Sequence, residues 1–200
     1  MQRARAIFLD RDGVINKMYY HLDVGAIDTP LTTRQVEFVP HIFDFLRNVK
    51  KLGYLLILVS NQPGFGLKKL SWKNFSAIKR KIAKTLNRYG ISLDGEYYCF
   101  HHPYAKLKLY RKHCTCRKPR AGLFKRAIKD FNIDIKKSWL IGDGVFDIVV
   151  GKGLGVRTIL LANINEGEYL RILEGRLESA TPDFLVKSLK EAWKIIKKHS

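Results

Sequence analysis

Short apolar runs alternate with longer amphipathic stretches along most of this chain. The apolar runs have the length of buried strands and cover residues 6–9, 54–59, 97–100, 139–141, 156–161 and 184–186. Apolar residues recur at helical spacing over residues 42–52, 71–89, 122–131 and 189–196. Strands separated by helices form a mostly parallel sheet that is covered on both faces. The pattern therefore predicts a doubly wound α/β fold.

The length and composition fit a single domain. The chain has 200 residues, of which 46% are hydrophobic and 28% charged, so we expect one folded unit over residues 1–200. Residues 14–39 are the least regular stretch, and we interpret them as a long loop or flap. A separate cap domain needs roughly 50 residues or more, so we expect none here. No apolar run reaches the ~18 residues of a membrane span.

The strong positive charge predicts an anionic substrate or partner. Thirty-seven Lys and Arg against 18 Asp and Glu give a formal net charge of +19. Such a surface concentrates phosphorylated metabolites, nucleic acid or acidic lipid, and net charge does not choose among them. A general basic bias without a specific partner is the alternative. The first ten residues lack the apolar core of a signal peptide, so we expect a cytoplasmic protein, and a monomer without membrane contact.

Polar side chains stand at the carboxyl ends of the predicted strands, where ligands bind in sheets of this kind. They are Asp10, Asp12, Ser60, Asn61, Gln62 and Asp143. Two carboxylates two positions apart can converge on one spot, and Gly13 permits the tight turn that this requires. Carboxylates from two strand ends suit Mg²⁺, which prefers oxygen ligands. An acid-rich turn with a structural role is the alternative interpretation.

A basic pair, Arg117 and Lys118, precedes Pro119. Arg offers phosphate a fork of donors and Lys offers a point charge, so together they can clamp a phosphate group. Because the chain holds 37 basic residues, such pairs also arise by chance. The pair is informative only if the fold brings it to the strand ends.

All three cysteines lie close together in the sequence. With one nearby histidine they give four candidate metal ligands, namely Cys99, His101, Cys114 and Cys116. Three thiolates and one imidazole match a closed tetrahedral structural zinc site, so we expect zinc on the loop of about residues 99–116. His102 and His113 are alternative imidazole ligands. Free buried thiols are the alternative to a metal site.

The order of these motifs resembles that of the haloacid dehalogenase superfamily of phosphohydrolases over about residues 5–165. The resemblance implies a Rossmann-like fold and an aspartyl-phosphate mechanism. It implies that Asp10 is the nucleophile and that Asp12 is the general acid and base. It also implies that Ser60 and Lys118 hold the transferring phosphoryl group.

The same resemblance implies a magnesium site. Its ligands would be Asp10, Asp143 and the backbone carbonyl of Asp12, and Asp147 would support them. The chemistry agrees, because a carboxylate accepts a phosphoryl group only when a metal and a Lys offset the charge repulsion.

Four segments look like those of the D-glycero-D-manno-heptose 1,7-bisphosphate phosphatase group within that superfamily. They are Phe-Leu-Asp-Arg-Asp-Gly at 8–13, Ser-Asn-Gln at 60–62, Tyr-Tyr-Cys-x-His-His-Pro at 97–103 and Cys-x-Cys-Arg-Lys-Pro at 114–119. Related histidinol-phosphate phosphatases have a much shorter loop between the two ligand pairs, so the long loop favours the heptose group. The resemblance implies that Arg117 recognises substrate and that Asn61 and Gln62 line the pocket. The chain departs from the group after Asn16 and at Gly144.

Three functional hypotheses follow. The first is a Mg²⁺-dependent phosphatase of a small phosphorylated sugar, with structural zinc. The second is a phosphatase of histidinol phosphate, nucleotides or nucleic-acid ends, which the +19 charge and the uncapped site favour. The third is a non-enzymatic basic nucleic-acid-binding module on the same scaffold, against which the intact set of acids argues. If the protein is a sugar phosphatase, we expect its binding of nucleic acid to be weak and non-specific.

Overall fold

The centre of the molecule is a six-stranded sheet in the order β5-β4-β1-β6-β7-β8, in which all neighbouring strands are parallel. The computed structural model describes residues 3–22, 25–162 and 181–200. The strands are β1 (Ala6–Leu9), β4 (Leu55–Asn61), β5 (Gly95–Cys99), β6 (Trp139–Gly142), β7 (Arg157–Leu161) and β8 (Phe184–Val186). The prediction of a doubly wound α/β fold is confirmed.

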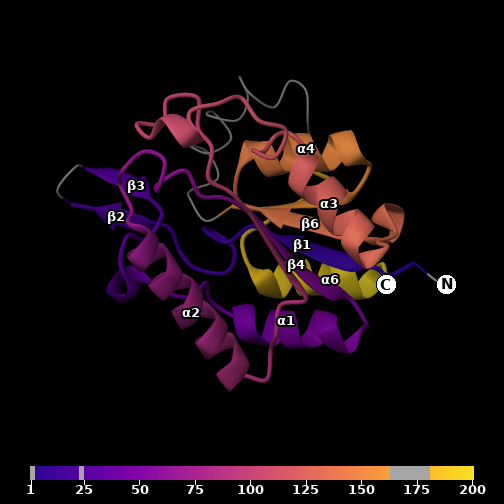
Figure 1. Cartoon of the computed structure of the whole chain (residues 1–200). Helices are drawn as coiled ribbons and strands as arrows, with labels where there is room; N and C mark the ends of the chain where they lie inside the picture. The colour runs from indigo at the N-terminus through magenta and orange to yellow at the C-terminus, as the bar shows by residue number, and fades with distance from the viewer. Residues whose placement is uncertain (1–2, 23–24, 163–180) are drawn as a thin grey trace.

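Helices cover both faces of the sheet (Figure 1). Alternate residues of a strand point to opposite faces, so each strand contributes to two separate cores. Ile7 and Leu9 pack on one face, which is covered by α1 (Ile42–Lys51), α2 (Trp72–Arg88) and α6 (Leu189–Lys198). Ala6 and Phe8 pack on the other, which is covered by α3 (Gly122–Phe131) and α4 (Val145–Leu154). Because β1 is central and buried on both faces, the residues that follow it are held rigidly.

The stretch over residues 14–39 is more ordered than predicted. It contains an antiparallel hairpin of β2 (Tyr19–His21) and β3 (Ala26–Asp28), followed by a short 3₁₀ helix, Thr33–Gln35. The prediction of a loop or flap is therefore wrong for these two strands. The paired residues Tyr20 and Ile27 are 53% and 59% exposed, so the hairpin lacks the alternating apolar face that identifies a strand. Within the described residues no second domain covers the strand ends, which confirms that there is no cap.

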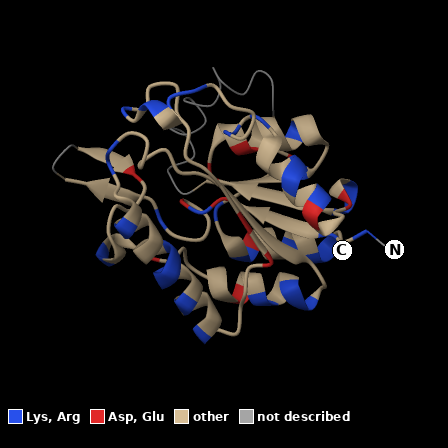
Figure 2. Cartoon of the chain, viewed as in Figure 1, with Lys and Arg blue, Asp and Glu red and all other residues tan. Residues whose placement is uncertain are grey.

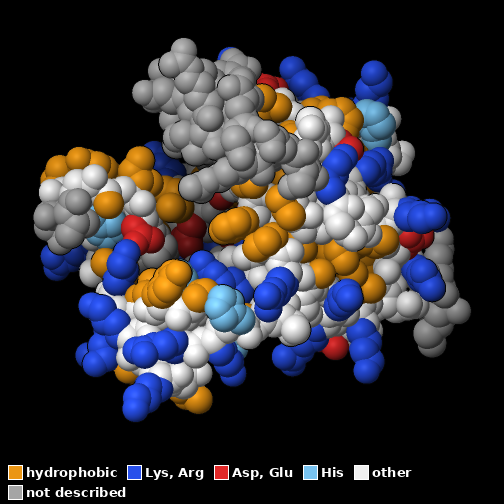
Figure 3. All heavy atoms as spheres, turned by 90° about the horizontal axis from the view of Figure 1, so that it is seen from above, with side chains coloured by type: hydrophobic (Ala, Val, Ile, Leu, Met, Phe, Trp, Pro, Cys, Tyr) orange, Lys and Arg blue, Asp and Glu red, His pale blue; other side chains and the backbone are white. Residues whose placement is uncertain are grey.

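Lys and Arg residues occur along several helices, α2 among them (Figure 2). Seen from above, Lys and Arg are spread around the visible face and do not form one stripe (Figure 3). Among the helices that the structure describes, none has both the length and the apolar character needed to span a bilayer.

Candidate active site and metal centres

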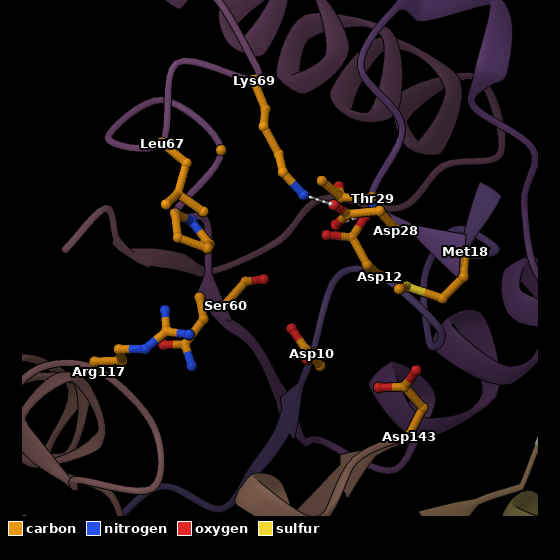
Figure 4. A pocket seen from close by; sticks show the side chains of 13 residues that line it. Asp10, Asp12, Met18, Asp28, Thr29, Ser60, Leu67, Lys69, Arg117 and Asp143 are labelled. Carbon is orange, nitrogen blue, oxygen red and sulfur yellow. Dashed lines mark hydrogen bonds and ion pairs between the residues drawn. The ribbon is translucent and has the colours of Figure 1, made fainter. Parts of the chain in front are cut away.

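The carboxyl ends of the central strands open into one pocket of about 240 Å³ (Figure 4). Asp10 follows β1, Ser60 and Asn61 end β4, and Asp143 follows β6. The remaining wall comes from the hairpin segment, the loop after β4 and the zinc-loop region, through Met18, Asp28, Thr29, Pro63, Gly64, Leu67, Lys69 and Arg117. The structure thus brings most of the predicted site residues to a single cavity.

Asp10 lies at the floor of this pocket with its carboxylate held from two sides. Its backbone amide donates to the carbonyl of Ile141 at 3.1 Å, which fixes the chain between β1 and β6. One carboxylate oxygen accepts from the backbone amide of Arg11 at 2.6 Å. The other lies 2.8 Å from Nζ of Lys118. The side chain is 15% exposed, so a substrate can reach it.

Lys118 is a buried cation shared between two carboxylates. Its Nζ lies 2.8 Å from Asp10 and 2.7 Å from Asp147, and it also donates to the carbonyl of Val59. Burial by itself lowers the pKa of a lysine, but here the charges of Asp10 and Asp147 prevail and raise the pKa of Lys118. The ammonium therefore stays charged beside Asp10, where a phosphoryl group would sit.

Three carboxylates form a compact cluster at the floor of the pocket. Asp10, Asp143 and Asp147 each offer an oxygen, and these oxygens lie within 4.8 Å of one another. Burial raises the pKa of Asp143 well above its usual value, and the nearby charges of Asp10 and Asp147 raise it further. Burial likewise raises the pKa of Asp147 to about 6, although Lys118 opposes the shift. An all-oxygen donor set with surplus negative charge fits a hard cation such as Mg²⁺.

Two glycines make this crowding possible. Gly13 has φ of +83°, and a Cβ placed on it would lie 1.9 Å from a carboxylate oxygen of Asp143. A Cβ on Gly142 would lie 2.2 Å from Cβ of Asp147. Any side chain at either position would displace a carboxylate from the cluster.

Asp12 is held by a ring of donors. Its oxygens accept hydrogen bonds from the guanidinium of Arg11 at 3.0–3.2 Å, from Asn16 at 2.8 Å and from Gln62 at 2.6 Å. Burial raises the pKa of this carboxyl, but Arg11 and the hydrogen bonds outweigh burial and leave the pKa below its usual value. The carboxylate also lines the pocket, within reach of a bound substrate.

The three residues at the end of β4 have different surroundings. Ser60 lines the pocket and its hydroxyl accepts from Nε2 of Gln62 at 3.1 Å. Asn61 also lines the pocket, and its side-chain amide pairs with the backbone of Lys118 at 3.0 and 3.2 Å. Gln62 is buried and is not part of the pocket wall; it contacts Asp12 and Ser60.

Arg117 lies at the pocket rim, beside the cysteine cluster. Its guanidinium donates to the carbonyl of His101 at 3.3 Å, which ties the rim to the loop that carries the cysteines. Met18, Asp28, Thr29 and Lys69 also line the wall and were not predicted from the sequence. Lys69 and Asp28 form an ion pair of 2.7 Å across the opening (Figure 4). These residues belong to no motif, so only the fold could reveal them.

The cysteines and one histidine form a compact cluster. The ligand atoms of Cys99, His101, Cys114 and Cys116 lie within 4.8 Å of one another, and five of their separations are 3.2–3.7 Å. A tetrahedral zinc with bonds of about 2.3 Å to sulfur has edges of about 3.8 Å, so the cluster has the size of such a site. Nδ1 of His101 points into it, whereas Nδ1 of His102 accepts from the backbone of Tyr104 at 3.1 Å. The geometry selects His101 over His102.

Comparison with known proteins decides the family. A family model described as polynucleotide kinase 3 phosphatase matches residues 27–153, and one described as HAD-hydrolase-like matches residues 115–192. The chain is 38% identical over 158 residues to the D-glycero-β-D-manno-heptose-1,7-bisphosphate 7-phosphatase of Haemophilus ducreyi, which covers 78% of this chain and 82% of that protein. It is 33% identical over 193 residues to that of Escherichia coli K12, covering 96% and 94%. This chain belongs to that phosphatase family.

A solved structure supports this membership at the level of the fold. The D,D-heptose 1,7-bisphosphate phosphatase from B. bronchiseptica, crystallised with magnesium and phosphate, superposes with a TM-score of 0.78. It is 20% identical and covers 98% of this chain and 99% of its own. As a member of this phosphatase family the chain is an enzyme of the haloacid dehalogenase type, which confirms the first hypothesis at the level of family and reaction. The non-enzymatic hypothesis is set aside.

Proposed function

We propose that this enzyme removes the 7-phosphate of D-glycero-β-D-manno-heptose 1,7-bisphosphate. The contact between Asp10 and the buried ammonium of Lys118, at the floor of an open pocket, carries the proposal. It pairs a nucleophile with a fixed positive charge, as phosphoryl transfer to a carboxylate requires. The family supplies the sugar, because its curated relatives are named for this substrate.

The reaction takes place in two steps. In the first, the phosphate ester binds as its monoanion and passes its proton to Asp12. A carboxylate oxygen of Asp10 then attacks phosphorus, the bond to the sugar oxygen breaks, and that oxygen takes the proton from Asp12. In the second, a water oxygen attacks the aspartyl phosphate and gives its proton to Asp12. The bond between phosphorus and Asp10 then breaks, and inorganic phosphate leaves with that proton, so both carboxylates are restored.

Neighbouring groups hold the phosphoryl group during both steps. Lys118 offsets its negative charge, and the hydroxyl of Ser60 offers a donor at the pocket wall. Arg117 at the rim is placed to bind a second phosphate.

Two metals complete the proposed enzyme. The carboxylates of Asp10 and Asp143, together with the backbone carbonyl of Asp12, would hold Mg²⁺, and Asp147 would support them beside Lys118. Mg²⁺ supplies charge neutralisation when it is bound. Zinc in the cluster of Cys99, His101, Cys114 and Cys116 would be structural, since four protein ligands leave no open position. It would fix the loop that ends at Arg117.

A substrate panel tests the proposal. Phosphate release from the heptose bisphosphate should exceed release from histidinol phosphate and from 3′-phosphorylated oligonucleotides, and it should require Mg²⁺. The phosphate that leaves should be the one at C7, as seen by phosphorus NMR of the product. Preference for another substrate would contradict the assignment of the sugar.

A second candidate function is the removal of phosphate from nucleic-acid ends. The match of residues 27–153 to the polynucleotide kinase 3 phosphatase model favours it, and so does the net charge of +19. The spread of Lys and Arg over the surface argues for weak, non-specific contact with nucleic acid (Figure 3). We further propose that the enzyme is a cytoplasmic monomer built as one domain over residues 1–200.

A further inference from the structure

In the sequence, Arg11 stands between Asp10 and Asp12, the two catalytic aspartates of the proposed mechanism. Its side chain is completely buried. Buried arginines are rare, and they are retained where a fork of donors must fix an anion. Nε and Nη2 donate to Oδ1 of Asp12 at 3.2 and 3.1 Å, and Nη2 also donates to Oδ2 at 3.0 Å. The guanidinium also lies 5.9 Å from the ring centre of Phe75. These contacts fix the position of the guanidinium from several sides.

The same guanidinium reaches the hairpin segment. Nη2 of Arg11 donates to the hydroxyl of Thr29 at 2.7 Å, and Thr29 lines the pocket directly after β3. A ring nitrogen of His21, on β2, lies at hydrogen-bond distance, 3.0 Å, from the carbonyl of Thr29. The neighbouring Asp28 pairs with Lys69 at 2.7 Å (Figure 4). A continuous set of contacts thus runs from the pocket rim through Thr29 and Arg11 to Asp12.

This network carries an unusual share of unsatisfied polar atoms. Within residues 3–22, 25–162 and 181–200, five buried side-chain atoms have no hydrogen-bond partner, and three of them belong to residues that hold Asp12. They are Nη1 of Arg11, Oδ1 of Asn16 and Oε1 of Gln62. Orphaned buried polar atoms reduce stability. Their concentration around one carboxylate indicates that the arrangement serves the reaction, since it is not optimal for folding.

We propose that Arg11 is a positioning residue for Asp12 and that Thr29 couples its orientation to the hairpin segment at the pocket rim. The proposal rests on the role of Asp12 as general acid and base in the proposed function. The hydroxyl of Thr29 holds the guanidinium, and the guanidinium aims the carboxyl group of Asp12 at the oxygen of the leaving group. Substrate contact with the rim is thereby linked to the proton transfer at the floor of the pocket.

The variant Thr29→Val tests this link, because it removes the hydroxyl and keeps the shape. Proton donation matters for a sugar alkoxide and little for para-nitrophenolate, which leaves without a proton. We expect kcat/KM for the heptose bisphosphate to fall about tenfold, part of the 10²–10⁴ that acid–base catalysis contributes. The value of kcat/KM for para-nitrophenyl phosphate should fall by a clearly smaller factor, because its leaving group needs no proton. Thr29→Ser, which keeps the hydroxyl, should have the wild-type kcat/KM for both substrates.

Matched variants separate positioning from folding. Thr33→Val, in the 3₁₀ helix of the same segment, should leave both substrates unaffected. Arg11→Lys keeps the charge but loses the fork, so it should show the same leaving-group dependence with a larger loss. Equal losses on both substrates, or no loss in Thr29→Val, would overturn the inference. A wild-type enzyme inactive on both substrates would overturn the proposed function itself.

Discussion

At the scale of single residues, Lys118 balances the charge of the site. Its ammonium contacts Asp10 and Asp147, while Asp143 lies in the same carboxylate cluster. Removing one partner of a buried ion pair leaves an uncompensated buried charge. The free energy of unfolding then falls by more than it does when an exposed ion pair is broken.

The variant Lys118→Met should therefore be inactive and less stable. We expect its free energy of unfolding to fall by about 3 kcal/mol in the presence of a chelator. Mg²⁺ should reduce this deficit, because a cation at the carboxylates replaces part of the lost charge. Urea titrations with EDTA and with Mg²⁺ measure both effects, and the exposed Lys125→Met provides the control. Equal stability of wild type and Lys118→Met in EDTA would contradict the account.

Sequence patterns located the residues at strand ends but not those that hold them. Asp10, Ser60 and Asp143 were predictable because each follows or ends an apolar run whose fold position is fixed. Thr29 and Lys69 were not, because they come from irregular segments that reach the pocket only through tertiary packing. The role of Gln62 also needed the structure, since its buried side chain contacts Asp12 and Ser60 and is not part of the pocket wall.

At the scale of elements, the loop that carries the cysteines shows a contrast between two adjacent histidines. His101 contributes Nδ1 to the cysteine cluster, whereas His102 caps a turn at Tyr104. The sequence spacing left both open, because either imidazole could reach the cysteines. The backbone path after β5 decides between them.

We expect one zinc per chain in the wild-type enzyme and in His102→Ala, and a loss of zinc in His101→Ala. Because metal binding contributes folding energy, His101→Ala should also melt at a lower temperature. Elemental analysis and thermal denaturation measure the two outcomes. Zinc retained at full occupancy in His101→Ala, or absent from wild type, would refute the assignment.

One carboxylate adds to the attachment of the edge strand β8, which also pairs with β7. Asp183 accepts from Lys152 of α4 at 2.6 Å and from the amide and hydroxyl of Thr158 in β7 at 2.7 and 2.8 Å. Burial raises the pKa of Asp183, but these contacts outweigh it and leave the pKa below its ordinary value. The folded state thus favours the ionised form.

This shift gives stability a defined pH dependence. A lowered pKa contributes stability that is present above the unfolded value of about 3.9 and is lost as the pH falls through the folded value. Asp183→Asn should therefore be less stable than wild type at pH 7, by about 1 kcal/mol or less, because solvent screens the contacts of this partly exposed carboxylate. The gap should narrow below about pH 4. Urea titrations from pH 7 down to the lowest pH at which both proteins fold measure it, and a constant gap would contradict the prediction.

At the scale of the whole molecule, the formal net charge is +19, Lys and Arg are spread around the face seen in Figure 3, and a cluster of three carboxylates lies in the site. The parallel sheet and its helices followed from periodicity, because each strand is a continuous apolar run between helices. The hairpin of β2 and β3 could not be predicted in this way, because its exposed strands are not apolar runs. The distribution of charge also depends on the fold and could not be obtained from composition.

The spread charge predicts weak, salt-sensitive binding of oligonucleotides. Affinity should fall steeply with salt, as counterion release requires, and should vanish near physiological ionic strength. Fluorescence anisotropy with single-stranded and duplex probes at two salt concentrations measures this. Tight binding that persists at physiological salt would favour the nucleic-acid-end phosphatase.

The most direct test of the central claim is to trap the phosphoryl group on Asp10. Asp12→Asn lacks the base that activates water, so with para-nitrophenyl phosphate it should accumulate the aspartyl phosphate. Mass spectrometry after a rapid acid quench should find one phosphoryl group on the peptide that contains Asp10. The double variant Asp10→Asn/Asp12→Asn should carry none. A phosphoryl group on another residue, or Mg²⁺-dependent turnover by Asp10→Asn alone, would contradict the account.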